Sequence, residues 1–101
     1  MKTADARKLS DLVSVGPATL RDFDRLGIGN VEQLAKQDPL NLYLRMCDLE
    51  GKRIDPCLRD VFSAAVAQAR DPELPEEKRK WWYWSTVRKA NAGAGTTASR
   101  R

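Results

Sequence analysis

Proline recurs where helices are expected to begin, and it divides the chain into short segments. Pro17, Pro39 and Pro56 each follow a glycine or an aspartate. Proline suits the first turn of a helix because its missing N–H would have no partner there, and aspartate suits the cap before it. Between these points apolar residues recur three or four positions apart, as on one helix face, and no segment alternates with the period of a strand. The sequence therefore predicts an all-α fold, a compact bundle of five or six short helices.

The first half of the chain predicts four of these helices. One covers residues 4–13 and a second covers residues 17–26, with Gly27 as its C-terminal cap. Because a tight turn joins them, they form a helical hairpin at the N-terminal end. A third, short helix begins at Asn30, which is spaced from the glutamine three residues later as in a capping box. The fourth begins at Asp38-Pro39, and its expected inward stripe is Leu40, Tyr43, Leu44 and Cys47.

The second half predicts two longer helices and a tail. The helix over residues 55–69 is expected to bury one continuous stripe, formed by Leu58, Val61, Phe62, Ala65, Val66 and Ala69. The last helix is expected from Glu76-Glu77, whose charges suit a helix N-terminus, to Arg88-Lys89, whose charges suit the other end. We assign residues 1–90 to one domain and expect residues 91–101, which are small and polar, to be a disordered basic tail.

The positive charge of the chain is concentrated near its C-terminus. The whole sequence has a net charge of +4, which suggests a polyanion such as DNA as a partner. Residues 1–75 carry 11 Lys or Arg and 12 Asp or Glu, whereas residues 76–101 carry 7 and 2. The basic surplus therefore lies in the last quarter, and attraction to a polyanion is expected to be strongest there.

Several classes of protein are excluded by composition. No apolar run is long enough to span a membrane and the first ten residues have no apolar signal core, so we expect a cytoplasmic protein without membrane contact. Cys47 and Cys57 are too few for a disulfide scaffold, and with no histidine a Cys2His2 zinc site is impossible. Two buried structural thiols are favoured over a redox or metal role, and we expect no metal and no cofactor.

The turn between the first two helices resembles a known DNA-binding motif. The segment SVGPATLRDFDRLGI, residues 14–28, is similar to the helix-hairpin-helix of DNA-binding and DNA-repair proteins, with serine in place of the first hairpin glycine. The resemblance implies that backbone N–H groups of the hairpin and of the following helix hold a DNA phosphate without reading sequence. Helix N-termini have the unpaired donors and the dipole for this. The candidate residues are Ser14, Val15, Gly16, Ala18 and Thr19.

The charge around this turn leaves two interpretations open. Residues 9–28 carry two basic and three acidic side chains, which is unfavourable beside a DNA backbone. Ala18 stands where many DNA-binding members have Lys or Arg, and Ser14 adds a Cβ where close approach favours glycine. The turn is either a phosphate site or a purely structural joint, because a motif does not carry its function with it.

A wider resemblance covers about residues 9–88. The segments DPLNLYLRMC (38–47), DPC (55–57) and KWWYW (80–84) resemble the bacterial "pathogenicity locus" family of helix-hairpin-helix proteins, which has been linked to mitomycin resistance. A similar hairpin followed by a Leu-Tyr helix occurs in the C-terminal domain of TfoX-type competence regulators. The resemblance implies an all-helical fold and an association with DNA, and it implies no established reaction.

The aromatic and basic segment near the C-terminus also has two interpretations. Residues 81–84 read Trp-Trp-Tyr-Trp, and such rings either clamp the last helix onto a small core or form a stacking platform for bases. Trp82 points away from the others on a helix and is the better candidate for exposure. The basic run Lys78, Arg79 and Lys80 is either a solvated face or a contact for a polyanion.

The functional expectation is a non-catalytic module that binds DNA independently of sequence. Without histidine the usual proton carrier is missing, and no paired carboxylates or phosphate loop replace it, so we expect no enzyme activity. The hairpin and the basic C-terminal segment, with Lys78, Arg79, Lys80 and Trp82, are the expected contacts. The alternative is an adaptor or regulator that binds a protein and uses the hairpin only structurally. The sequence leaves the oligomeric state open.

Overall fold

The protein is all-α. A computed structural model describes residues 7–97, with side chains described for residues 7–90, and no strand occurs within that range. The elements are a 3₁₀-helix η1 (Leu9–Asp11), the helices α1 (Pro17–Arg25), α2 (Val31–Ala35), α3 (Pro39–Glu50) and α4 (Cys57–Arg70), a 3₁₀-helix η2 (Glu76–Arg79) and the helix α5 (Trp81–Thr97). The predicted fold class is confirmed.

Local capping chemistry begins several of these helices as the sequence predicts. The side chain of Asp38 accepts a hydrogen bond from the N–H of Asn41 at 3.2 Å. Asn30 accepts one from the N–H of Gln33 at 2.8 Å, which caps α2. Pro17 occupies the first position of α1. Each bond satisfies a donor that the helix itself leaves unpaired.

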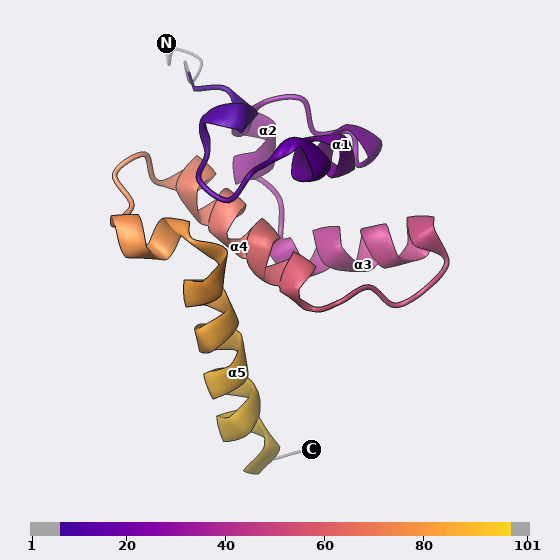
Figure 1. Ribbon diagram of the computed structural model, residues 1–101, viewed down its shortest axis with the longest axis vertical. Helices are drawn as coiled ribbons and strands as arrows, with labels where there is room; N and C mark the ends of the chain where they lie inside the picture. Colours follow the sequence, from indigo (N-terminus) through magenta and orange to yellow (C-terminus); the bar gives the residue numbers. More distant parts are fainter. Residues whose placement is uncertain (1–6, 98–101) are drawn as a thin grey trace.

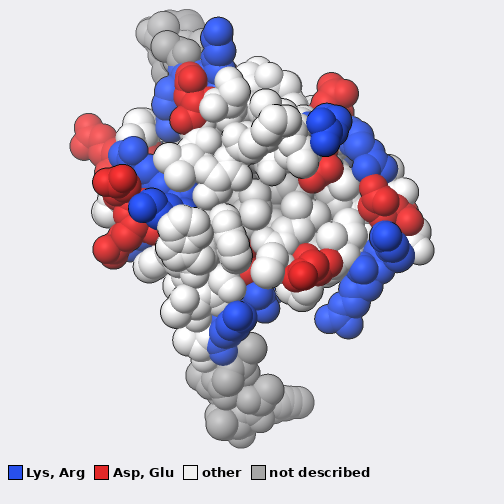
Figure 2. Space-filling model, viewed as in Figure 1, with Lys and Arg blue, Asp and Glu red and all other residues white. Residues whose placement is uncertain are grey.

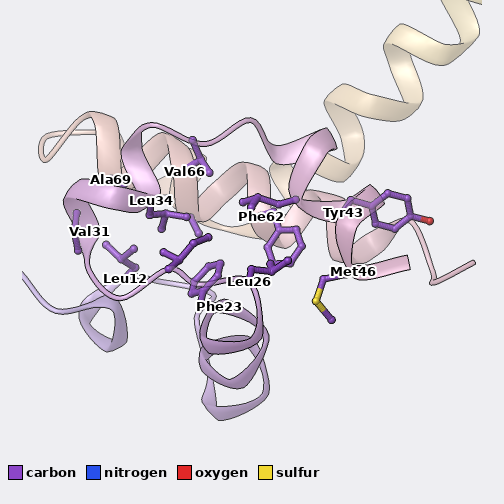
Figure 3. Packing of buried hydrophobic residues seen from close by; sticks show 13 residues of the cluster. Leu12, Phe23, Leu26, Val31, Leu34, Tyr43, Met46, Phe62, Val66 and Ala69 are labelled. Atoms are coloured by element: carbon purple, nitrogen blue, oxygen red, sulfur yellow. The ribbon is translucent and has the colours of Figure 1, made fainter. Parts of the chain in front are cut away.

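Helix α4 is the centre of the bundle. It packs against α2, α3, η2 and α5 (Figure 1). The main core forms where α4 meets the N-terminal elements, and Figure 3 shows Phe23, Leu34 and Phe62 within it. The rings of Phe23 and Phe62 lie 5.7 Å apart between centroids. The core residues are Leu12, Phe23, Leu26, Ile28, Val31, Leu34, Leu42, Tyr43, Met46, Phe62, Ala65, Val66 and Ala69.

The helix predicted over residues 4–13 is wrong for the residues that the structure describes. Only the single turn η1 is helical there, and Leu12 is extended, with φ −77° and ψ 139°. The backbone of Val13 is instead hydrogen-bonded to the side chain of Gln68 on α4. A contact distant in sequence therefore replaces the local helix, and residues 4–6 lie outside the described range.

The stripe predicted for α3 faces the wrong way in part. Leu40 and Leu44 are 39% and 54% exposed, and Cys47 is half-buried. The buried face of the helix consists of Leu42, Tyr43 and Met46. The physical reason is that α3 carries leucines on more than one side, so its packing against α4 selects the buried face.

The last predicted helix is divided in two. Lys80 is extended, with φ −98° and ψ 137°, and separates η2 from α5. Helix α5 then begins at Trp81, and its far end projects from the rest of the bundle (Figure 1). It continues to Thr97, into the segment expected to be disordered, and residues 98–101 lie outside the described range.

Candidate nucleic-acid interface

The turn before α1 has a backbone conformation that normally favours glycine. Ser14 has φ +73°, and it is the one non-glycine residue with positive φ in the described part of the chain. An L-residue pays a cost of order 1 kcal/mol or more in this region. The serine at this position is therefore expected to provide a contact that glycine lacks.

The hydroxyl of Ser14 provides that contact by joining the turn to the start of α5. It accepts a hydrogen bond from the N–H of Trp81 at 3.1 Å and donates one to the carbonyl of Arg79 at 3.2 Å. Trp81 is the first residue of α5, so Ser14 caps this helix from 67 positions away in the sequence. The hydroxyl of Ser14 is therefore engaged within the protein.

Gln68 makes a second link between the same elements. Its side chain is buried, accepts from the N–H of Val13 at 2.9 Å and donates to the Val13 carbonyl at 2.8 Å. The same amide nitrogen lies 3.1 Å from the carbonyl of Ala64 and 3.3 Å from that of Arg79. Sequence reasoning missed this residue, although a single glutamine among the alanines at the end of α4 was a signal. Together Gln68 and Ser14 fix the turn against η2 and α5.

The start of α1 is open. The first main-chain bond of the helix runs from the N–H of Leu20 to the carbonyl of Gly16 at 2.9 Å, which leaves the N–H groups of Ala18 and Thr19 without a partner in the helix. Gly16 has an ordinary extended backbone, and a Cβ added there would meet no atom within 4 Å. The fold therefore does not require glycine at this position, and the space in front of it is accessible.

Val15 is placed differently from the other predicted hairpin contacts. Its N–H donates to the carbonyl of Leu12 at 3.3 Å, and its side chain packs against the core. Neither group is available to a ligand.

Two lysines of the basic run lie beside aromatic rings of α5. The Nζ of Lys80 is 5.5 Å from the ring centroid of Trp82, and the Nζ of Lys78 is 6.0 Å from that of Tyr83. Trp82 is 55% exposed, the largest exposed fraction among the exposed large apolar side chains of the described residues. Cations at these distances are attracted by the ring face, and the side-chain ends still reach water. Arg79 differs, because its Nε donates to the carbonyl of Leu74 at 2.8 Å.

The other aromatic residues of the cluster are half-buried outside the main core. Trp84 donates from Nε1 to the carbonyl of Lys78 at 2.7 Å, which holds η2 against α5. The rings of Tyr83 and Trp84 meet edge to face, with centroids 5.2 Å apart. These rings therefore stabilise the joint between η2 and α5, whereas Trp82 faces solvent.

Part of the C-terminal positive charge is neutralised inside the protein. Arg88 on α5 forms a two-pronged ion pair with Asp60 on α4, with Nε–Oδ1 and Nη2–Oδ2 distances of 2.9 and 3.0 Å. Asp60 is buried, and its hydrogen bond with Arg88 raises the pKa of the guanidinium. On the face shown in Figure 2, basic and acidic side chains are mixed around the edge and uncharged ones occupy the middle. Lys78, Arg79 and Lys80 form no ion pair with a carboxylate of the described residues, so they carry the positive charge of this segment.

The two cysteines are free thiols and both are half-buried. A hydrogen bond with Asp55, together with burial, raises the pKa of the Cys57 thiol. In the part of the chain that the structure describes, no three His, Cys, Asp or Glu side chains are grouped to hold a metal ion. The helices of this part also lack the length and apolarity needed to cross a bilayer.

Comparison with known proteins places the chain in a family. Residues 2–90 match the Pathogenicity locus family, and the chain belongs to it. A relative named mitomycin resistance protein McrB, from Streptomyces lavendulae, is 43% identical over 89 residues, which cover 88% of this chain and 81% of the relative. No solved structure is significantly similar to the chain.

Proposed function

We propose that the protein binds DNA without catalysing a reaction, through a surface formed by the start of α1 and the junction of η2 with α5. The observation that carries the proposal is the pair of hydrogen bonds from Ser14 to Arg79 and Trp81, at 3.2 and 3.1 Å. Through these bonds the turn expected to hold a phosphate lies beside the basic and aromatic segment. Positioning and attraction are then supplied by neighbouring parts of one surface.

Each part of this surface has a distinct role. The backbone N–H groups of Gly16, Ala18 and Thr19 hold a phosphate at the positive end of α1. Lys78 and Lys80 supply the electrostatic attraction. The exposed ring of Trp82 stacks on an unpaired base, which favours single-stranded over double-stranded DNA.

The proposal of a non-catalytic role rests on the available chemistry. The sequence contains no histidine, and general acid–base catalysis near neutral pH most often uses one. The charged pair buried deepest, Asp60 with Arg88, is engaged in holding α5 to α4. We also propose that this chain contributes to mitomycin resistance, because the relative that is 43% identical to it is named for that resistance.

The alternative is a protein-binding adaptor in which the turn is structural. It is favoured by the engagement of the Ser14 hydroxyl inside the protein and by the net charge of −1 over residues 9–28. In that case the start of α1 makes no contact with a ligand.

Fluorescence anisotropy with labelled single- and double-stranded DNA across a salt series tests the proposal. We expect binding that weakens as salt rises, with tighter binding of the single strand. Replacing Lys78 and Lys80 by glutamine should reduce the slope of log K against log salt by about 0.7 per lost phosphate contact on a single strand. The matched control is Lys36→Gln, an exposed lysine at the end of α2, which should leave the slope unchanged. An absence of binding at about 50 mM salt, where screening is weak, would overturn the proposal.

The variant Gly16→Val tests whether Gly16 belongs to a phosphate site or only serves the fold. The backbone of Gly16 is compatible with a side chain and the space beside it is empty, so we expect the fold to be retained and DNA binding to be weaker. Because valine is a poorer N-cap than glycine, the melting temperature should fall slightly. If binding is unchanged, the start of α1 is not a phosphate site and the adaptor role is favoured.

A further inference from the structure

A groove with an apolar floor lies away from the proposed DNA surface. It is lined by the outward face of α3, the loop over residues 51–56, the first turn of α4 and Arg88 of α5, and it has a volume of about 960 Å³. None of the residues proposed to contact DNA lines it. The groove is therefore a feature that the proposed function does not use.

Apolar side chains of α3 form the floor of the groove. Leu40 and Leu44, one turn apart, are 39% and 54% exposed, and Tyr43 and Cys47 lie beside them. Rows of side chains spaced by four residues are the ridges that pack into the grooves of another helix. The described chain leaves this pair of leucines uncovered.

The opposite wall of the groove is fixed in place. The hydroxyl of Tyr43 donates a hydrogen bond to the carbonyl of Ile54, and Figure 3 shows this hydroxyl directed away from the core. The N–H of Ile54 lies 3.5 Å from the Sγ of Cys47, a second contact between loop and helix. The loop is thus attached to α3 at two points, so the groove is already formed in the free protein.

The charges along the groove are mainly positive. Lys52, Arg53 and Arg59 line it against a single acidic residue, Asp48. Within the described residues, no carboxylate forms an ion pair with any of the three. Arg88 also lines the groove but is paired with Asp60. A ligand with negative charge beside its apolar groups therefore matches both the floor and the rim.

We propose that this groove binds an amphipathic helix of a partner protein, one that carries leucine-like side chains at positions i and i+4 and Asp or Glu beside them. The apolar face of the helix packs on Leu40 and Leu44, and its carboxylates meet Lys52, Arg53 and Arg59. The charge complementarity sets the orientation and the rate of association more than the affinity. This site is independent of DNA binding at the start of α1.

A peptide selection tests the proposal with the full chain. The probe is a displayed library of helical peptides of about 16 residues, or roughly four turns, with leucine fixed at i and i+4 and Asp, Glu, Lys, Ser or Ala elsewhere. We expect acidic peptides to be enriched, and the enriched peptides to bind at least about tenfold more weakly to Leu44→Glu and to Lys52→Glu/Arg53→Glu. Leu49→Glu is the matched control, because Leu49 is 52% exposed but lies outside the groove, and it should leave binding unchanged.

Three results of the peptide selection would overturn the proposal. They are no enrichment, enrichment of basic peptides, and equal weakening by Leu49→Glu and Leu44→Glu. Self-association in sedimentation experiments that Leu44→Glu abolishes would identify a second copy of the chain as the occupant and would also contradict it. Loss of DNA binding in Leu44→Glu with no effect on peptides would assign the groove to DNA. Gly16→Val changes only the start of α1, and Leu44→Glu changes only the groove. A loss of DNA binding and a loss of peptide binding can therefore be told apart.

Discussion

The hydroxyl of Ser14 accepts a hydrogen bond from the N–H of Trp81 at 3.1 Å, across 67 residues of sequence. Through this bond the turn before α1 caps the helix that carries the exposed tryptophan. The two regions that the sequence marks as candidates for DNA contact therefore lie next to each other.

Ser14→Ala should destabilise the protein by about 1–2 kcal/mol, because it removes the cap of α5 and keeps the strained positive φ. Ser14→Gly removes the same hydroxyl but relieves the strain, so its cost should be smaller. Urea denaturation of both variants measures the difference. Ser10→Ala, at an exposed serine of η1, is the control and should change stability by less than about 0.5 kcal/mol. Equal stability of the wild type and Ser14→Ala would show that the bond to Trp81 contributes nothing.

Gln68→Leu should cost about 2–4 kcal/mol, because a similar volume replaces an amide that bonds both backbone polar groups of Val13 and the carbonyl of Arg79. The amide exchange of residues near Val13 should also become faster, since the turn loses its attachment to α4. Hydrogen exchange measured by NMR checks this. Gln37→Leu, whose exposed amide bonds only a carbonyl one turn earlier, serves as the control. A similar cost for the two variants would contradict the role of Gln68.

Arg88→Met should destabilise the protein by about 3–5 kcal/mol, because it leaves the buried carboxylate of Asp60 without its partner. The double variant Asp60→Leu/Arg88→Met should recover most of this loss, since no charge then remains buried. Denaturant unfolding of both variants tests the pair. The exposed neighbour Lys89 provides the comparison, as Lys89→Met should be nearly neutral. If the double variant does not recover stability, the pair stabilises the fold by more than the neutralisation of the buried Asp60 carboxylate.

Asp22→Asn should raise the melting temperature at pH 7 and have little effect near pH 3. Burial raises the pKa of Asp22 above its ordinary value, with Glu50 contributing in the same direction and Arg25 opposing it. A raised carboxyl pKa means that the folded state binds the proton more tightly than the unfolded state does. The ionised form therefore destabilises the fold above both pKa values, and this penalty disappears as pH falls through the raised pKa. Thermal unfolding between pH 3 and pH 7 measures it, and a destabilised variant at pH 7 would contradict the assignment.

The parts of the fold that depend on neighbouring residues are predictable from the sequence. Asn30 and Asp38 begin helices through bonds to N–H groups three residues away, so the signal is local and the helices are found where expected. The helix expected over residues 4–13 fails in its described part because Val13 bonds to Gln68, 55 positions away. No local pattern contains that contact.

The buried face of α3 could not be chosen from periodicity for a different reason. Leucines at positions 40, 42 and 44 place apolar groups on several sides of the helix, and only the position of α4 determines which of them is covered. In the candidate site, too, one feature follows from the local sequence and another depends on the tertiary structure. The exposure of Trp82 follows from its place on a helix, whereas the contact from Ser14 to Trp81 requires the tertiary structure.

An NMR titration of the ¹⁵N-labelled protein tests directly whether the turn and the basic segment bind DNA together. The ligand is a single-stranded oligonucleotide of about 12 nucleotides, near the site size of one small binding domain. If the turn and the basic segment bind DNA together, the amide signals of Gly16, Ala18 and Thr19 should shift with those of Lys80 and Trp82, and all should give the same dissociation constant. Signals from the α3 groove should not move. Shifts confined to one of the two regions, or no shifts at low salt, would contradict the claim that the turn and the basic segment form one DNA-binding surface.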